Sequence, residues 1–378
     1  MKKIYFDNAA TTKIDPSVLT TINNVMKENY GNPSSSHSFG RASRTIVEKA
    51  RKSIAQEFCV SSSEIFFTSG GTESDNMVLV SAVRDLKIQT IITSKVEHHA
   101  VLNVAKYLEK KYAINVIYVK IDSNGSVDYK DLEQILESNK SKTLVSLMHV
   151  NNEIGSILDI KRVGNICKKH NAIFHSDTVQ SIGRYGIDLS AINVDFIVGS
   201  AHKFHGPKGI GFVYISENIK IKPLLRGGSQ ERNMRAGTEN IYGIAGLALA
   251  MELAYKNLKL ERSYIEDIKL YMIEKLTSQI VDVQFYAKSA DIKNSLYTVL
   301  SCHFPETDIA EMLLFNLDIL GIACSGGSAC ASGSNSGSHV LSEIVSETKR
   351  PGIRFSFSKF TTKDDIDYTV KQLKTLFP

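Results

Sequence analysis

The middle of the chain alternates short apolar segments with amphipathic ones, and this alternation constrains the fold more than any other feature of the sequence. The apolar segments are rich in β-branched residues, which favour strands. They span residues 90–94, 115–121, 143–150, 172–177, 194–200 and 210–215. Segments with helical periodicity lie between most of them, at 99–112, 128–138 and 159–169. The pattern predicts an α/β fold in which helices cover both faces of a mainly parallel central sheet.

The pattern changes near residue 255. A long amphipathic helix is expected over 256–280, because apolar residues recur there at intervals of three and four. Short strands follow at 296–304 and 352–358, with a helix at about 307–317 between them. We therefore expect a large domain over residues 16–255 and a smaller α+β domain over residues 256–378. The N-terminal residues 1–15 are expected to pack with the smaller domain.

Composition excludes several classes of protein. A net charge of +5 is small for 378 residues and the lysines are scattered, so no nucleic-acid or membrane partner is expected. No apolar run approaches the roughly 18–20 residues of a membrane span. The five cysteines include no C-x-x-C pair, which argues against a disulfide framework or a structural zinc site. A reducing cytoplasm is the expected location, and no metal is expected.

Polar side chains follow four of the predicted strands. His98 follows the strand at 90–94, Asn152 follows 143–150, Asp177 ends 172–177, and Lys203 follows 194–200. Ligands in open α/β sheets bind beyond the carboxyl ends of the strands. We therefore expect these side chains to share one site.

The segment FFTSGGTESDN (66–76) has two interpretations. A strand breaks at Ser69-Gly70-Gly71, and Thr72 and Glu73 open a helix. Converging backbone N–H groups at a helix N-terminus favour an anion such as phosphate. The segment is equally consistent with a tight strand-to-helix turn capped by threonine. It is neither a P-loop nor a dinucleotide-binding fingerprint.

Lys203, in GSAHKFHGPKGIG, also has two interpretations. A lysine at a buried strand end has a lowered pKa, and its neutral amine can form a Schiff base with an aldehyde. Alternatively, it is a surface lysine in a glycine-rich turn. A phosphate site, a lysine and an acid such as Asp177 are together the groups that pyridoxal 5'-phosphate requires. Their presence favours the first interpretation.

Ten segments, in order along the chain, resemble the cysteine desulfurases of the NifS/IscS type, which are class V, fold-type I pyridoxal-phosphate enzymes. They are YFDNAATT (5–12), GNPSSSHSFGR (31–41), TSGGTESDN (68–76), VEHHAV (96–101), MHVNNEIGSI (148–157), HSDTVQSIG (175–183), SAHKFHGPKGIG (200–211), GGSQERNMRAGTEN (227–240), SGGSACASG (325–333) and IRFSFSKFTT (353–362). The resemblance implies a large cofactor-binding domain and a smaller C-terminal domain.

The resemblance also implies roles for individual residues. Lys203 would bind the cofactor covalently, Asp177 would pair with its ring nitrogen, and Gln180 would hydrogen-bond its phenolic oxygen. His98 would stack on the ring and assist proton transfer. The residues that would hold the phosphate are Gly71, Thr72, Ser200 and His202, with Thr238 from the second subunit of a homodimer. Asn152, which would also contact the cofactor, and Arg354 would meet the substrate, L-cysteine.

Cys330 lies in SGGSACASGSNSGS (325–338), where ten of fourteen residues are serine or glycine. The resemblance implies that its thiolate attacks the substrate sulfur, forms a persulfide, and leaves alanine. Such a composition has low stiffness, which suits a thiol that must reach a sulfur-acceptor protein such as an iron–sulfur scaffold. Cys324 departs from the family pattern, and either packs as a small residue, accepts the persulfide, or forms a disulfide with Cys330. Cys59, Cys167 and Cys302 are expected to be packing residues.

Three functions are compatible with these features of the sequence. The first is a cysteine desulfurase that supplies sulfur for iron–sulfur clusters, thiocofactors or tRNA thiolation. The second keeps the cofactor but changes the substrate, as in selenocysteine lyase or a transaminase; a reactive thiol favours desulfuration, because transaminases need none. The third is a non-catalytic sulfur-transfer partner. The combination of Lys203, Asp177, His98 and Cys330 argues against it.

Overall fold

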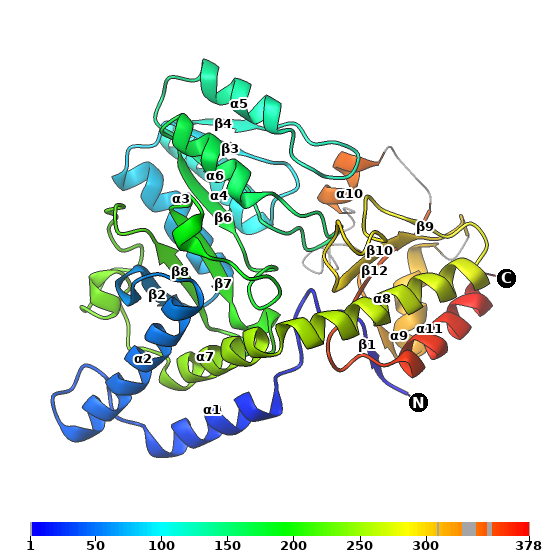
Figure 1. Cartoon of the computed structure of the whole chain (residues 1–378), viewed down its shortest axis with the longest axis horizontal. Helices are drawn as coiled ribbons and strands as arrows, with labels where there is room; N and C mark the ends of the chain where they lie inside the picture. Colours follow the sequence, from blue (N-terminus) through cyan, green and yellow to red (C-terminus); the bar gives the residue numbers. More distant parts are fainter. Residues whose placement is uncertain (1, 308–309, 327–337, 346–349, 378) are drawn as a thin grey trace.

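A seven-stranded sheet forms the centre of the larger part of the molecule (Figure 1). The computed structural model describes residues 2–307, 310–326, 338–345 and 350–377. The strands are β2 (Ile65–Thr68), β3 (Thr90–Thr93), β4 (Asn115–Tyr118), β5 (Thr143–Ser146), β6 (Ile173–Asp177), β7 (Phe196–Ser200) and β8 (Gly211–Ile215), in the order β2-β8-β7-β6-β5-β3-β4. Strands β7, β6, β5, β3 and β4 are parallel, and β8 is antiparallel to both β7 and β2. The predicted α/β fold with a mainly parallel sheet is confirmed.

Both faces of this sheet are buried, because successive strand residues point to opposite sides. Phe66 packs against α3 (Gly71–Asp85) and α4 (His99–Tyr112), whereas its neighbours Ile65 and Phe67 pack on the opposite face. That second face is covered by α1 (Pro16–Glu28), α2 (Ser38–Glu57), α5 (Tyr129–Ser138), α6 (Ile160–Lys169) and α7 (Ile241–Lys256). Short 3-10 turns lie at Ser62–Glu64, Leu189–Ala191, Ala201–Lys203, Glu231–Asn233 and Ala310–Met312.

Capping side chains explain where several of these helices begin. Asp15 accepts a hydrogen bond from the Ser17 amide, and Pro16 opens α1. Asp128 and Asp159 cap α5 and α6 in the same way. Each side chain satisfies a backbone N–H that has no partner inside the helix.

The C-terminal part has its own core. It contains the antiparallel strands β12 (Gly352–Ser356), β10 (Val299–His303) and β9 (Gln284–Phe285), in that order. β1 (Ile4–Tyr5) pairs in parallel with β11 (Ile322–Ala323), so the N-terminal segment packs here. The helices are α8 (Leu258–Gln279), α9 (Leu313–Ile319), α10 (His339–Ile344) and α11 (Lys363–Leu376). Of the predicted helix at 307–317, residues 308–309 lie outside the described residues; the described part is a 3-10 turn over Ala310–Met312 followed by α9, which runs to Ile319.

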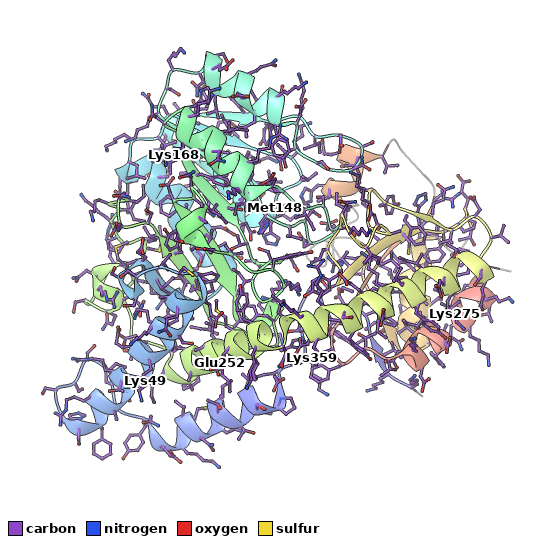
Figure 2. All side chains as sticks on the ribbon, viewed as in Figure 1. Lys49, Met148, Lys168, Glu252, Lys275 and Lys359 are labelled. Carbon is purple, nitrogen blue, oxygen red and sulfur yellow. The ribbon has the colours of Figure 1, made fainter. Side chains whose placement is uncertain are left out.

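Helices α7 and α8 follow one another along one side of the molecule and meet at Asn257 (Figure 1). Residues before this point form the two large cores on the faces of the sheet, and most of those after it join Ile4 and Phe6 in another, while smaller clusters span the two parts. Lys359, labelled in Figure 2, links the two parts through Asp15 at 2.8 Å and Glu261 at 3.3 Å. These cores support a domain division near residue 255, which stays a prediction. Among the described residues, no helix is long and apolar enough to cross a membrane.

Candidate active site

A cavity of about 250 Å³ lies at the carboxyl ends of the parallel strands. Figure 2 labels one of its apolar wall residues, Met148, which follows β5. The predicted site residues that line the cavity are Gly71, Thr72, His98, Asn152, Asp177, Gln180, Ser200, His202, Lys203 and Arg354. Cys330 lies outside the described residues. The individual roles of all these residues remain predictions, but the expectation of a shared cavity matches the geometry.

One end of the cavity is suited to an anion. Gly70 precedes α3 with φ of +152°, a conformation that favours glycine, and no side chain of the described residues caps this helix. The first-turn N–H groups of Gly71 and Thr72 therefore have no capping acceptor, and the helix dipole adds positive charge. Ser200 borders the same turn, since a Cβ at position 70 would lie 3.5 Å from its hydroxyl oxygen. This arrangement favours the phosphate interpretation of the segment over the simple turn.

His202 stands beside this anion site in the 3-10 turn after β7. Its Nδ1 is 3.1 Å from the Thr11 hydroxyl. Burial lowers the pKa of His202 to about 4, with a further contribution from Lys203. The imidazole is therefore neutral at physiological pH and can offer one N–H to an anion.

Asp177 supplies the acid at the floor of the cavity. It ends β6, is buried, and accepts a hydrogen bond from the Val179 amide at 2.9 Å. Burial raises the pKa of Asp177, while the nearby His98 and Lys203 oppose that rise. A positive group bound next to this carboxyl would stabilise its charged form.

Lys203 points toward the N-terminal segment. Its Nζ donates to the carbonyl oxygens of Ala9 and Ala10, each at 2.8 Å. Gln180 also reaches this segment, donating from Nε2 to the Ala9 oxygen at 3.0 Å. Reasoning from strand ends does not predict that the backbone carbonyls of Ala9 and Ala10 bind Lys203. The signal was available in the motif YFDNAATT.

His98 is held by its own helix. It is the N-cap of α4, and its Nδ1 accepts a hydrogen bond from the Ala100 amide at 3.1 Å. Accepting at Nδ1 places the proton of the neutral ring on Nε2. Burial lowers the pKa of His98, Asp177 opposes this, and Lys203 adds to it.

Arg354 is carried into the cavity by β12 of the C-terminal part, and only 1% of it is exposed. Its Nη1 donates to the Asn152 carbonyl at 3.0 Å, and its Nη2 donates to Asp7 at 2.8 Å. Within the described chain, its Nε is buried without a hydrogen-bond partner. The guanidinium is thus positioned with a donor still available. Asp7, again from YFDNAATT, was not identified from the sequence.

Thr238 lies elsewhere. It is exposed and borders a separate cavity of about 70 Å³ together with Arg235 and Glu239. Thr238 therefore does not border the anion site of its own chain. A role toward a second copy of the chain stays a prediction.

The four described cysteines are free thiols. Cys167 and Cys302 are buried, which raises the pKa of each, so their packing role is supported. Cys59 is exposed, and the prediction that it packs is wrong: it follows the end of α2, where φ is +57°. Cys324 packs against the C-terminal core, and burial raises its pKa to about 12. A thiol that stays protonated favours packing over sulfur transfer.

Comparison with known proteins agrees with this geometry. Residues 4–369 match the family model for aminotransferase class-V proteins. Cysteine desulfurase IscS of Dictyoglomus turgidum is 41% identical over 388 aligned positions, which cover 100% of this chain and 97% of the relative. The chain belongs to the cysteine desulfurases of the aminotransferase class-V family. This family depends on pyridoxal 5'-phosphate, so the predicted enzyme class and cofactor are confirmed.

Solved structures extend the comparison for this desulfurase. A NifS-like protein superposes with a TM-score of 0.91 at 37% identity, covering 99% of each chain. SspA in complex with cysteine superposes with a TM-score of 0.80 at 29% identity, covering 96% of this chain and 100% of that one.

The residues of the desulfurase cavity fit this cofactor. An uncapped helix N-terminus suits its phosphate, and the buried Asp177 suits its ring nitrogen. Lys203 supplies the amine, and His98 borders the same space. The donor set therefore offers partners of suitable chemistry for the phosphate, the ring nitrogen and the aldehyde of the cofactor.

Proposed function

We propose that the enzyme transfers the sulfur of L-cysteine to Cys330, releases L-alanine, and passes the sulfur to an acceptor protein such as an iron–sulfur scaffold. One observation carries this proposal: Lys203, Asp177, His98 and Arg354 line the same cavity although they come from different elements. The structural relative SspA in complex with cysteine supports the choice of substrate. Bound pyridoxal phosphate would act as an electron sink for bonds at the substrate's α-carbon.

Arg354 is the proposed binder of the substrate carboxylate. Its partners Asp7 and Asn152 hold the guanidinium plane in place, and its Nε has no partner within the described chain. A planar guanidinium binds a carboxylate with paired hydrogen bonds. This orients the amino acid so that its sulfur can be presented in a defined direction.

His98 is the proposed proton carrier. Because Nδ1 is engaged by the Ala100 amide, proton exchange with the site takes place at Nε2. The lowered pKa keeps the ring neutral at physiological pH. It can therefore exchange a proton without a buried positive charge persisting beside Lys203.

Cys330 is the proposed sulfur acceptor, on the evidence of its segment SGGSACASG. Its thiolate sulfur forms an S–S bond with the substrate sulfur while the substrate C–S bond breaks. The bonding electron pair stays on the carbon side, which takes up a proton and leaves as alanine. Cys330 then carries a persulfide, and its transfer to the acceptor regenerates the thiol.

A homodimer and a cytoplasmic location complete the proposal. Thr238 is exposed and lies apart from its own chain's cavity, which supports a role at the phosphate of a second subunit. The free state of the four described cysteines supports a reducing compartment.

The test compares Cys330→Ala with Cys324→Ala in the cofactor-loaded full-length chain. Alanine and sulfide are quantified after addition of L-cysteine and a reductant, and the visible spectrum reports the cofactor. We expect Cys330→Ala to keep the spectrum and lose sulfide release, and Cys324→Ala to keep both. Sulfide release by Cys330→Ala at the wild-type rate would refute the proposal. Loss of sulfide release in Cys324→Ala alone would instead identify Cys324 as the residue that accepts the substrate sulfur.

A further inference from the structure

Three carboxyl groups are buried close to one another, and two of them, Asp75 and Asp177, line the cavity. Asp75 of α3 and Glu97 before α4 are each 1% exposed, and Asp177 is 7% exposed. The proposed function uses only Asp177. Three negative charges cannot share so small an apolar volume, because each would raise the energy of the others. The surroundings of each carboxyl must therefore determine which of the three carries the charge.

Asp75 has a partner that the other two lack. Its Oδ1 lies 3.4 Å from Nε2 of His175, and both residues are buried. The opposite nitrogen of His175, Nδ1, is 2.9 Å from the hydroxyl of Ser146 on the neighbouring strand β5. Within the described chain, neither Asp75 Oδ1 nor His175 Nε2 has a hydrogen-bond partner, so each is the other's close polar contact without an aligned hydrogen bond in this conformation. The atoms thus form a row from Asp75 through His175 to Ser146.

The row lies directly beside Asp177. His175 and Asp177 are two residues apart on β6, so their side chains leave the same face of the strand. Asp75 also lines the cavity and belongs to the helix whose N-terminus forms the anion site. A charge on Asp75 would act on the same bound group as Asp177.

We propose that Asp75 and His175 are positioning residues that share one proton, and that this proton keeps Asp75 neutral so that Asp177 carries the charge. The proton resides on Asp75 Oδ1, and His175 accepts it at Nε2. His175 in turn donates from Nδ1 to the Ser146 hydroxyl. This inference rests on the proposed role of Asp177.

The electrostatic surroundings support this placement of the proton. Burial raises the pKa of Asp75, and the facing carboxyls of Asp177 and Glu97 raise it further. Burial lowers the pKa of His175 to about 3, so the ring is neutral. Burial raises the pKa of Glu97 to about 8, so this group also holds its proton at neutral pH. Of these three carboxyls, Asp177 alone faces Lys203, whose positive charge favours a charged carboxyl, and His98 acts in the same direction when it holds a proton.

The first measurement is the thermal stability of the apoprotein from about pH 5 to pH 8. A buried acid with a raised pKa stays protonated in the folded chain while the unfolded chain ionises, so stability falls as pH rises. Relative to Asp75→Asn, the wild-type folding equilibrium constant should fall about tenfold for each pH unit in this range. An equal pH dependence in the two proteins would overturn the proposal.

A double-mutant cycle tests whether Asp75 and His175 act together. We expect Asp75→Asn and His175→Gln to be non-additive in this pH dependence. Glu97→Gln is the matched control: Glu97 is equally buried, but its Oε1 is bound by Ser94 and by the Met148 amide instead. Glu97→Gln and His175→Gln should be additive. Additivity of both pairs would contradict proton sharing.

The second measurement is the affinity of the apoprotein for pyridoxal phosphate at neutral pH. Asp75→Asn should retain affinity within about threefold, because Asp75 is already neutral, whereas Asp177→Asn should lose at least about tenfold. A loss in Asp75→Asn equal to that in Asp177→Asn would show that Asp75 carries charge, and would overturn the inference. Full affinity of Asp177→Asn would instead refute the proposed role of Asp177.

Infrared spectroscopy of the wild-type apoprotein keeps the proposal testable if a variant does not fold. A protonated buried carboxyl has a C=O stretch distinct from that of a carboxylate, and it shifts on deuteration. Two such groups, Asp75 and Glu97, are expected at neutral pH. A spectrum without any protonated carboxyl at neutral pH would refute the inference.

Discussion

Replacement of Arg354 by lysine tests the substrate site most directly. The guanidinium donates to Asn152 O at 3.0 Å and to Asp7 at 2.8 Å, and it has a further buried donor at Nε. A lysine keeps the positive charge but places it on one nitrogen, which cannot occupy the separate positions from which the guanidinium nitrogens serve Asn152, Asp7 and a substrate carboxylate. Loss of one hydrogen bond to a charged group costs about 1.5–3 kcal/mol. The expected result is a rise in KM for L-cysteine of about 10- to 150-fold.

The assay follows alanine formation against L-cysteine concentration, with thermal stability measured without substrate. Arg350→Lys is the matched control: Arg350 is near the start of the same strand, but it pairs with Asp282 and His303 rather than lining the cavity. We expect its KM to match that of the wild type. A KM for Arg354→Lys within twofold of the wild type, in a protein of unchanged stability, would refute the assignment of Arg354 to the carboxylate.

Two further predictions concern buried charges away from the cavity. Glu231 binds Arg51 at 2.7 and 2.8 Å, and both side chains are 2% exposed. Glu231→Gln should therefore lower the free energy of unfolding in urea by about 3–5 kcal/mol. A loss below about 1 kcal/mol would contradict this prediction. Burial lowers the pKa of Lys269 to about 7, so wild-type stability should rise from about pH 7 to pH 10, where only the unfolded chain still holds the proton. The rise should be absent from the melting temperatures of Lys269→Met, and its persistence there would exclude Lys269 as its source.

Local patterns in the sequence were sufficient for most of the secondary structure. The segment predicted at 99–112 is α4, with the same bounds, and the predicted strands coincide with β3 to β8 to within a few residues. Apolar runs mark strands buried on both faces, so the period of the pattern is enough to place them. The strand predicted over 143–150 is shorter, because β5 ends at Ser146 and only single hydrogen bonds to β6 continue from Leu147 and His149.

The ends of these strands also allowed much of the cavity to be predicted. Parallel strands finish at one edge of a sheet, so His98, Asn152, Asp177 and Lys203 had to come near one another once the strand order was set. The resemblance to a known family added Arg354, which no local pattern distinguishes from a surface charge. That residue comes from a strand in the other part of the chain.

Only the tertiary structure decided what these side chains contact. Lys203 meets the carbonyls of Ala9 and Ala10 more than 190 residues earlier in the chain, and Arg354 meets Asp7 across 347 residues. Asp75, in turn, reaches His175 only because α3 packs against the end of β6. Periodicity records which face of an element is buried, but not which distant segment covers it. The sequence by itself thus determined the elements and the type of chemistry, whereas packing between distant segments determined the partners and hence the charge of each group.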